Sequence, residues 1–143
     1  MDPITKFIKS KEEQITKNSN FAVNNLEKDW EKFVHRDTYL VYDSKKDFLN
    51  IINKGKKQTS IPWYLFWDLQ LKKKLQNNFD ALNSFDDKIK NYNVTFVAKK
   101  KKEYKELFVT ENLVLDDDQQ TAVITDDKHN LIVAGAGSGK TEV

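Results

Sequence analysis

The chain of 143 residues contains no cysteine, two prolines, four glycines and two histidines. The absence of cysteine excludes disulfides and thiolate metal sites, and two histidines are too few for a histidine-rich metal site. No apolar run approaches the roughly 18 residues that a membrane-spanning helix requires. Residues 1–14 also lack the apolar core of a secretory signal peptide. The sequence therefore predicts a cytoplasmic protein that does not enter a membrane.

Basic and acidic side chains are unevenly distributed along the chain. Residues 1–109 carry 22 basic and 15 acidic side chains, whereas residues 110–143 carry 2 and 7. A basic body with an acidic tail suggests an anionic partner for the body, although lysine-rich helices that face solvent have the same composition. If the lysines lie along one side, they make weak, salt-sensitive contacts with DNA. The candidates are Lys54, Lys56, Lys57 and the lysine runs 72–74 and 99–102.

The hydrophobic pattern of the first three-quarters of the chain is helical. After residues 18–20, apolar side chains recur on one stripe of a helix that includes Leu26 and Trp30. Residues 39–42 fit either a brief strand or the end of that helix. A capping box at Ser44 opens a second helix that Gly55 can close, and a basic polar loop is expected over 54–60.

The longest apolar stripe is expected to begin near Ser60, with Pro62 in the first turn of its helix. We expect Trp63 and Trp67 to belong to the core, together with Trp30; a base-stacking surface is the alternative for the aromatic residues. A break near 83–84 or 91–93 and a last helix capped by Asn93 complete the pattern. The seven-residue spacing predicts two long helices packed as a hairpin or a short coiled coil, and it involves Leu75, Leu82, Ile89 and Phe96.

The last thirty or so residues have a different pattern. A short helix is expected over 115–125 and a polar turn over 126–130. Residues 131–134 form a continuous apolar run that fits a strand buried on both faces, as in a parallel sheet. This run leads directly into a glycine-rich segment that ends in Lys-Thr, which is the arrangement of a phosphate-binding loop.

The residue types of this segment suit nucleotide binding. Its three glycines allow backbone N–H groups to turn toward phosphate oxygens. Lys140 supplies a cation for the β- and γ-phosphates, and Thr141 supplies a hydroxyl ligand for Mg²⁺, so ATP and Mg²⁺ are the expected cofactors. Ala134 stands where the usual pattern has a glycine, at a position where a small residue suffices. The candidate cofactor-binding residues of the loop are Gly135, Ala136, Gly137, Ser138, Gly139, Lys140 and Thr141.

The segment LDDDQQTAVITDDKHNLIVAGAGSGKTEV resembles the opening of the ATPase core of superfamily 1 DNA helicases of the UvrD/Rep type. That family commonly carries AGAGSGKT and an upstream L-x-x-x-Q-x-x-A-V. The resemblance implies that Gln119 reads the adenine edge of ATP, that Lys140 is the phosphate lysine and that Thr141 is the Mg²⁺ ligand. Residues 1–103 are similar, more weakly, to the accessory region of helicase IV. The upstream pattern is matched by Leu115, Gln119, Ala122 and Val123.

The resemblance implies two parts. Residues 1–109 form a mainly α-helical accessory region, and residues 110–143 supply the first strand and phosphate-binding loop of an incomplete RecA-like α/β ATPase domain. The parent would be an ATP-dependent DNA helicase or translocase, of which this chain is the N-terminal piece. We expect no catalysis by the 143 residues alone, because they hold neither a Walker B acid nor an arginine finger.

Two further expectations accompany this interpretation. The alternative function is a small helical DNA- or protein-binding module with a vestigial ATPase segment. A strand buried on both faces does not stand alone, because its backbone polar groups stay unpaired. We therefore expect the tail to pair with a second chain, to pack against the helices or to be mobile, and self-association is one expected outcome.

Overall fold

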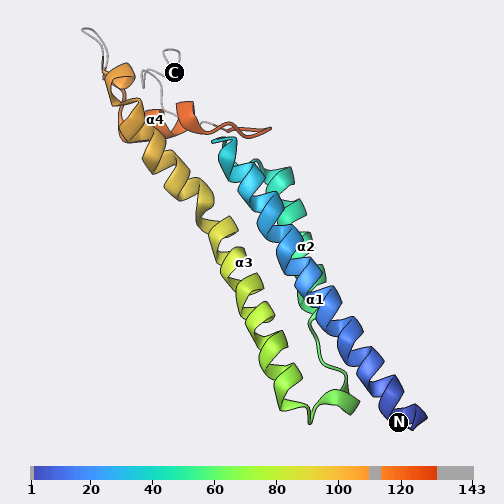
Figure 1. Ribbon diagram of the computed structural model, residues 1–143. Helices are drawn as coiled ribbons and strands as arrows, with labels where there is room; N and C mark the ends of the chain where they lie inside the picture. The colour runs from blue at the N-terminus through green and yellow to red at the C-terminus, as the bar shows by residue number, and fades with distance from the viewer. Residues whose placement is uncertain (1, 110–113, 132–143) are drawn as a thin grey trace. The chain divides into compact units, whose positions relative to one another are not determined.

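The computed structural model describes residues 2–109 and 114–131, and this part of the chain is all α-helical (Figure 1). The 3₁₀ helix η1 (Trp63–Leu65) precedes α3, and the 3₁₀ helix η2 (Lys105–Phe108) follows it. In the described residues there is no strand, only one isolated bridge between Val109 and Val114. None of the described helices combines the length and the hydropathy needed to cross a bilayer. The α-helices are α1 (Pro3–His35), α2 (Tyr42–Gln58), α3 (Leu69–Glu103) and α4 (Asp117–Ile124).

The chain divides into two compact units. Unit 1 comprises Met1–Thr38 and Lys46–Ile89, and unit 2 comprises Tyr39–Lys45 and Lys90–Val143. In unit 1, α1 lies beside α2 and beside the first half of α3 (Figure 1). The predicted mainly helical body is therefore confirmed.

Helix α1 begins at Pro3, well before the start expected near residue 20. The carboxylate of Asp2 accepts hydrogen bonds from the backbone N–H groups of Ile4 and Thr5 at 2.8 and 2.9 Å. Pro3 stands in the first turn, where a missing N–H costs nothing. The cap and the proline explain a start that the apolar pattern does not mark, because Ile4 and other apolar side chains of this first stretch are exposed.

The core of unit 1 includes the heptad residues Leu75, Leu82 and Ile89 of α3 and their partners on the other two helices. Leu82 is fully buried, and Leu26 of α1 and Ile52 of α2 are also buried. Gly55 lies within α2 and does not end it, so the loop expected over 54–60 is wrong except at its last two residues. A Cβ at Gly55 would lie 3.3 Å from both methyl carbons of Leu82, so the glycine permits close helix packing.

A small polar cluster interrupts this apolar core. The hydroxyls of Ser19 and Thr59 are 3.1 Å apart and buried, and the Asn78 amide donates to Ser19 Oγ at 2.9 Å. The Thr59 hydroxyl also donates to the carbonyl of Gly55. These hydrogen bonds connect the three helices of unit 1. They also offset the cost of burying polar groups in the core.

Helix α3 is continuous through both positions at which a break was predicted. The predicted cap at Asn93 is wrong because its side chain bonds to Leu40 instead. The start expected near Ser60 is also wrong: Pro62 caps η1, and Asp68 accepts from the N–H of Leu71 in the first turn of α3. The heptad prediction is confirmed, since its four members are all buried.

Candidate functional site

Of the predicted nucleotide-binding residues, only Gln119 belongs to the part of the chain that the structure describes. Gln119 lies in α4, within the helix expected over 115–125. Leu131 is 88% exposed and lies in no strand, while residues 132–134 of the expected strand are outside the described residues. The remaining predicted ligands also lie outside the described residues, and they are Gly135, Ala136, Gly137, Ser138, Gly139, Lys140 and Thr141.

Gln119 is held in a reciprocal cap at the first turn of α4. Its N–H donates to Asp116 Oδ1 at 2.8 Å, and its side-chain Oε1 accepts from the N–H of Asp116 at 2.9 Å. This capping box satisfies two backbone donors at the helix start. The neighbouring Gln120 is used differently, because its amide donates to the carbonyl of Leu115 at 2.8 Å.

The start of α4 is tied to the end of α3 within unit 2. Lys101 Nζ lies 2.6 Å from Asp117 Oδ1 and donates to the carbonyl of Asp117 at 3.0 Å. The N–H of Leu115 donates to the carbonyl of Phe108, and both side chains are buried. Gln119 therefore stands on a short helix with a fixed start.

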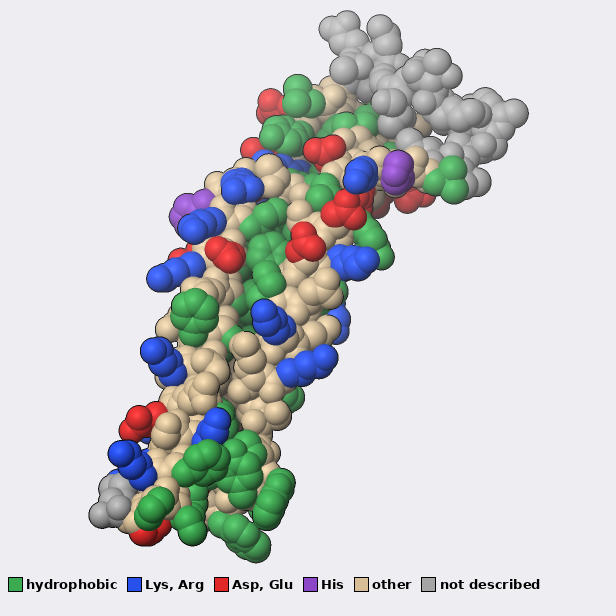
Figure 2. All heavy atoms as spheres, turned by 90° about the vertical axis from the view of Figure 1, so that its right-hand side faces the viewer, with side chains coloured by type: hydrophobic (Ala, Val, Ile, Leu, Met, Phe, Trp, Pro, Cys, Tyr) green, Lys and Arg blue, Asp and Glu red, His purple; other side chains and the backbone are tan. Residues whose placement is uncertain are grey.

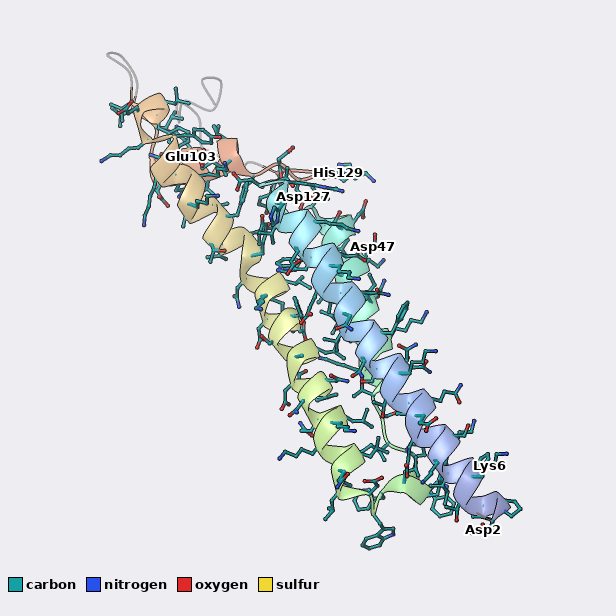
Figure 3. The ribbon with its side chains drawn as sticks, viewed as in Figure 1. Asp2, Lys6, Asp47, Glu103, Asp127 and His129 are labelled. Atoms are coloured by element: carbon teal, nitrogen blue, oxygen red, sulfur yellow. The ribbon has the colours of Figure 1, made fainter. Side chains whose placement is uncertain are left out.

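The predicted polar turn over 126–130 is confirmed, and it contacts the start of α2. Asp127 Oδ1 accepts from the N–H of Tyr42 at 3.2 Å, and Lys128 Nζ lies 3.0 Å from Asp43 Oδ2. A carboxylate at a helix N-terminus also interacts favourably with the helix dipole. Figure 3 labels Asp127 and His129 in this turn, which precedes the predicted strand.

Lys56, Lys100 and Lys101, all named as DNA contacts, form ion pairs within the chain. Lys100 is buried, and its Nζ lies 2.9 Å from Glu103 Oε2. Lys101 pairs with Asp117, as described above, and Lys56 Nζ lies 3.4 Å from Asp86 Oδ2. Lys73 and Lys74, near the start of α3, are exposed.

The core assignment of Trp63 and Trp67 is wrong. Trp63 is 85% exposed and Trp67 is 87% exposed, and both lie in the segment between α2 and α3. The apolar periodicity predicted that both belong to the stripe of α3. In the structure they lie between Pro62, which precedes η1, and Asp68, which caps the start of α3. Pro62 immediately before the aromatic run was the signal that could have revealed a non-helical segment.

Two hollows flank this exposed aromatic segment in unit 1. One, of about 470 Å³, includes Lys72 and Lys73 in its lining. The other, of about 650 Å³, includes Glu12, Glu13 and Asp68. Partial burial, followed by the nearby Asp68, raises the pKa of Glu12 above its usual value. The first hollow therefore has lysines and no carboxylate in its lining, whereas the second also contains Lys17 and Lys74 and so carries charges of both signs.

No group of three histidine or carboxylate side chains that could hold a metal occurs in residues 2–109 and 114–131. Comparisons with protein-family models, with curated proteins and with solved structures find no match to this chain. Any assignment of function therefore depends on the chemistry of the residues themselves.

Proposed function

We propose that this chain carries the adenine-reading glutamine and the phosphate-binding loop of an ATP-dependent DNA helicase or translocase of superfamily 1. One observation carries the proposal: Gln119 stands in the capped first turn of α4, at the family's spacing ahead of the AGAGSGKT segment. The tie between Lys101 and Asp117 supports it, because a residue that reads a base must have a fixed position.

Each residue has a defined task in this proposal. The amide N–H groups of Gln119 and the second lone pair of Oε1, whose first accepts from Asp116 N, would match the edge of adenine. Lys140 balances the charge of the β- and γ-phosphates, and the hydroxyl of Thr141 is a ligand for Mg²⁺. Residues 131–134 would be the first strand of the RecA-like sheet. Bound ATP supplies the phosphoanhydride bond whose hydrolysis drives movement along DNA.

The first experiment is to read the coding sequence after codon 143. An open frame that encodes an Asp-Glu motif supports the helicase, and a stop codon supports the alternative binding module. The polypeptide encoded by the whole frame is then assayed for ATP hydrolysis with and without single-stranded DNA. Lys140→Ala should reduce kcat by at least about 100-fold, since such charge stabilisation provides most of the catalysis. Normal DNA-stimulated hydrolysis by Lys140→Ala would refute the phosphate-loop assignment.

A matched pair of variants tests the adenine contact. Gln119→Glu keeps the oxygen that accepts from Asp116 N but removes the amide donor. It should raise the KM for ATP by about tenfold, the value of one or two hydrogen bonds, with little change in kcat. Gln120→Glu is the control and should leave the KM for ATP unchanged. Equal effects of the two substitutions would contradict the role of Gln119.

The alternative, a small helical binding module with a vestigial ATPase segment, is favoured by one observation. Unit 1 has a buried core of its own, which includes Leu26, Ile52 and Leu82. The coding sequence after codon 143 distinguishes the two functions.

A further inference from the structure

The segment between α2 and α3 exposes an unusual number of large rings. We call residues 62–68 the aromatic loop; its rings are Trp63, Tyr64, Phe66 and Trp67. Both tryptophans are almost completely solvent-exposed, and Phe66 is 54% exposed. Figure 2 shows hydrophobic side chains gathered at the end of unit 1 that holds this loop. Exposed apolar surface of this extent marks an interaction site more often than chance.

The aromatic loop is anchored by Leu65, and this anchoring keeps the neighbouring rings exposed. Leu65 is 3% exposed and packs with Leu71, Leu75 and Ile8. Its N–H donates to the carbonyl of Pro62 at 3.0 Å. Because the one buried side chain of the 3₁₀ turn points inward, the rings on either side of it point outward.

The indole rings of Trp63 and Trp67 are exposed enough to be reached by a flat ligand. Trp63 lies edge-to-face with Tyr64, and Phe66 lies edge-to-face with Trp67. Trp63 is therefore not stacked in parallel on Tyr64, nor Trp67 on Phe66. An indole that is more than four-fifths exposed offers its face to a nucleobase.

Cations lie directly beside these rings. Lys72 Nζ is 3.3 Å from the ring centroid of Phe66, and Lys56 Nζ is 5.9 Å from that of Phe79. The hollow of about 470 Å³ between the end of α2 and the start of α3 is lined by Lys72, Lys73 and Phe79, and its lining includes no carboxylate. Rings and ammonium groups therefore lie close together at two places on unit 1.

The second hollow has carboxylates as well as lysines in its lining, the lysines being Lys17 and Lys74. Its walls include Glu12, Glu13 and Asp68. A polyanion at the aromatic loop meets lysines without carboxylates only in the hollow of Lys72 and Lys73. This asymmetry favours a partner that carries flat apolar groups and regularly spaced negative charges.

We propose that the aromatic loop and the lysine-lined hollow bind single-stranded DNA. Bases stack on Trp63 and Trp67, and phosphates lie near Lys72 and Lys73. Single strands bind in this way because every base has a π-face and every nucleotide a charge. The choice of DNA rests on the proposed function, whereas the stacking and the charge rest on the geometry of unit 1.

The test measures the affinity of the 143-residue chain for fluorescein-labelled oligothymidylate of about 12 nucleotides at low salt. Trp63→Ala and Trp67→Ala should each weaken binding by about tenfold, in line with the loss of one stacked base. Leu69→Ala is the matched control, because Leu69 is 77% exposed at the same end but cannot stack; its affinity should be unchanged. Replacement of Lys72 and Lys73 by glutamine should reduce the dependence of affinity on salt.

An abasic oligomer of the same length separates stacking from charge. It should bind as weakly as the Trp63→Ala/Trp67→Ala variant binds oligothymidylate. Equal affinity for both oligomers, or unchanged affinity of the double variant, would overturn the proposal. Circular dichroism verifies that each variant keeps its helical content.

Two other outcomes would assign the surface to another partner. Binding to phosphatidylserine vesicles that Leu69→Ala weakens as much as Trp67→Ala, without oligothymidylate binding, would indicate a lipid surface. Dimerisation in analytical ultracentrifugation that the same two substitutions abolish, again without DNA binding, would indicate a second copy of the chain. Lys140→Ala should leave oligothymidylate binding intact, so failure here and failure of the ATPase proposal are distinguishable.

Discussion

The side chain of Asn93 bonds to both backbone groups of Leu40. Asn93 Oδ1 accepts from the N–H of Leu40 at 2.9 Å, and Asn93 Nδ2 donates to its carbonyl at 2.8 Å. Leu40 is 1% exposed and lies in the non-helical segment between α1 and α2. One carboxamide on α3 thus replaces the partner strand that an extended, buried segment otherwise needs. The brief strand considered for residues 39–42 is absent: residues 39–41 lie in no helix or strand, and α2 begins at Tyr42.

Loss of this pairing should destabilise the protein. Asn93→Ala leaves a buried N–H and a buried C=O without partners, so the free energy of unfolding should fall by about 1–3 kcal/mol. Urea denaturation followed by circular dichroism measures the change. Asn77→Ala, at an exposed position of the same helix, is the control and should change stability by less than about 0.5 kcal/mol. Similar values for the two variants would show that the pairing has no net effect.

The heptad residues of α3 should dominate the stability of unit 1. Leu82→Ala removes a fully buried side chain that also packs against Gly55, and a loss of about 2–5 kcal/mol is expected. Val94→Ala, which truncates a side chain that is 71% exposed on the same helix, should be close to neutral. Denaturation curves of the two variants give the comparison, and a small effect of Leu82→Ala would contradict the heptad packing.

The cap of α4 should control the local order around Gln119. Asp116→Ala removes the acceptor for the N–H of Gln119, which should cost about 0.5–2 kcal/mol of local helix stability. Hydrogen exchange of the Gln119 amide should accelerate accordingly. Asp118→Ala serves as the control, because Asp118 is an exposed first-turn acid that is not the cap. Equal acceleration in both variants would point to the helix dipole and not to the capping box.

Tyr39 should titrate at unusually high pH. Burial, followed by the negative charge of Asp127, raises the pKa of Tyr39 above its usual value, although a hydrogen bond with Asn93 opposes the shift. Because the pKa is higher in the folded state, the protonated Tyr39 contributes fully to the free energy of unfolding below its unfolded-state pKa, about 10. This contribution is lost as the pH rises through the folded-state pKa. Absorbance at alkaline pH reports the phenolate. Asp127→Asn should lower the pKa of Tyr39, and no change would exclude Asp127 as a cause.

The helical class, the buried heptad of α3 and the short helix before the polar turn could be predicted from the sequence. Each depends on local spacing or on a cap between residues close in the chain, as with Asp116 and Gln119. The division at 109/110 and the nucleotide-binding roles of Lys140 and Thr141 remain predictions, because they rest on motif residues beyond the described part of the chain.

The tertiary structure alone decided the features that join distant residues. Gly55 lies inside α2, where the absence of a side chain leaves room for Leu82. Asn93 lies inside α3, where its side chain bonds to the backbone of Leu40. Trp63 and Trp67 are outside because Leu65 between them fills the available core position. A periodic pattern specifies which residues can share a face, but contacts across 27 to 53 positions of sequence determine which face is buried.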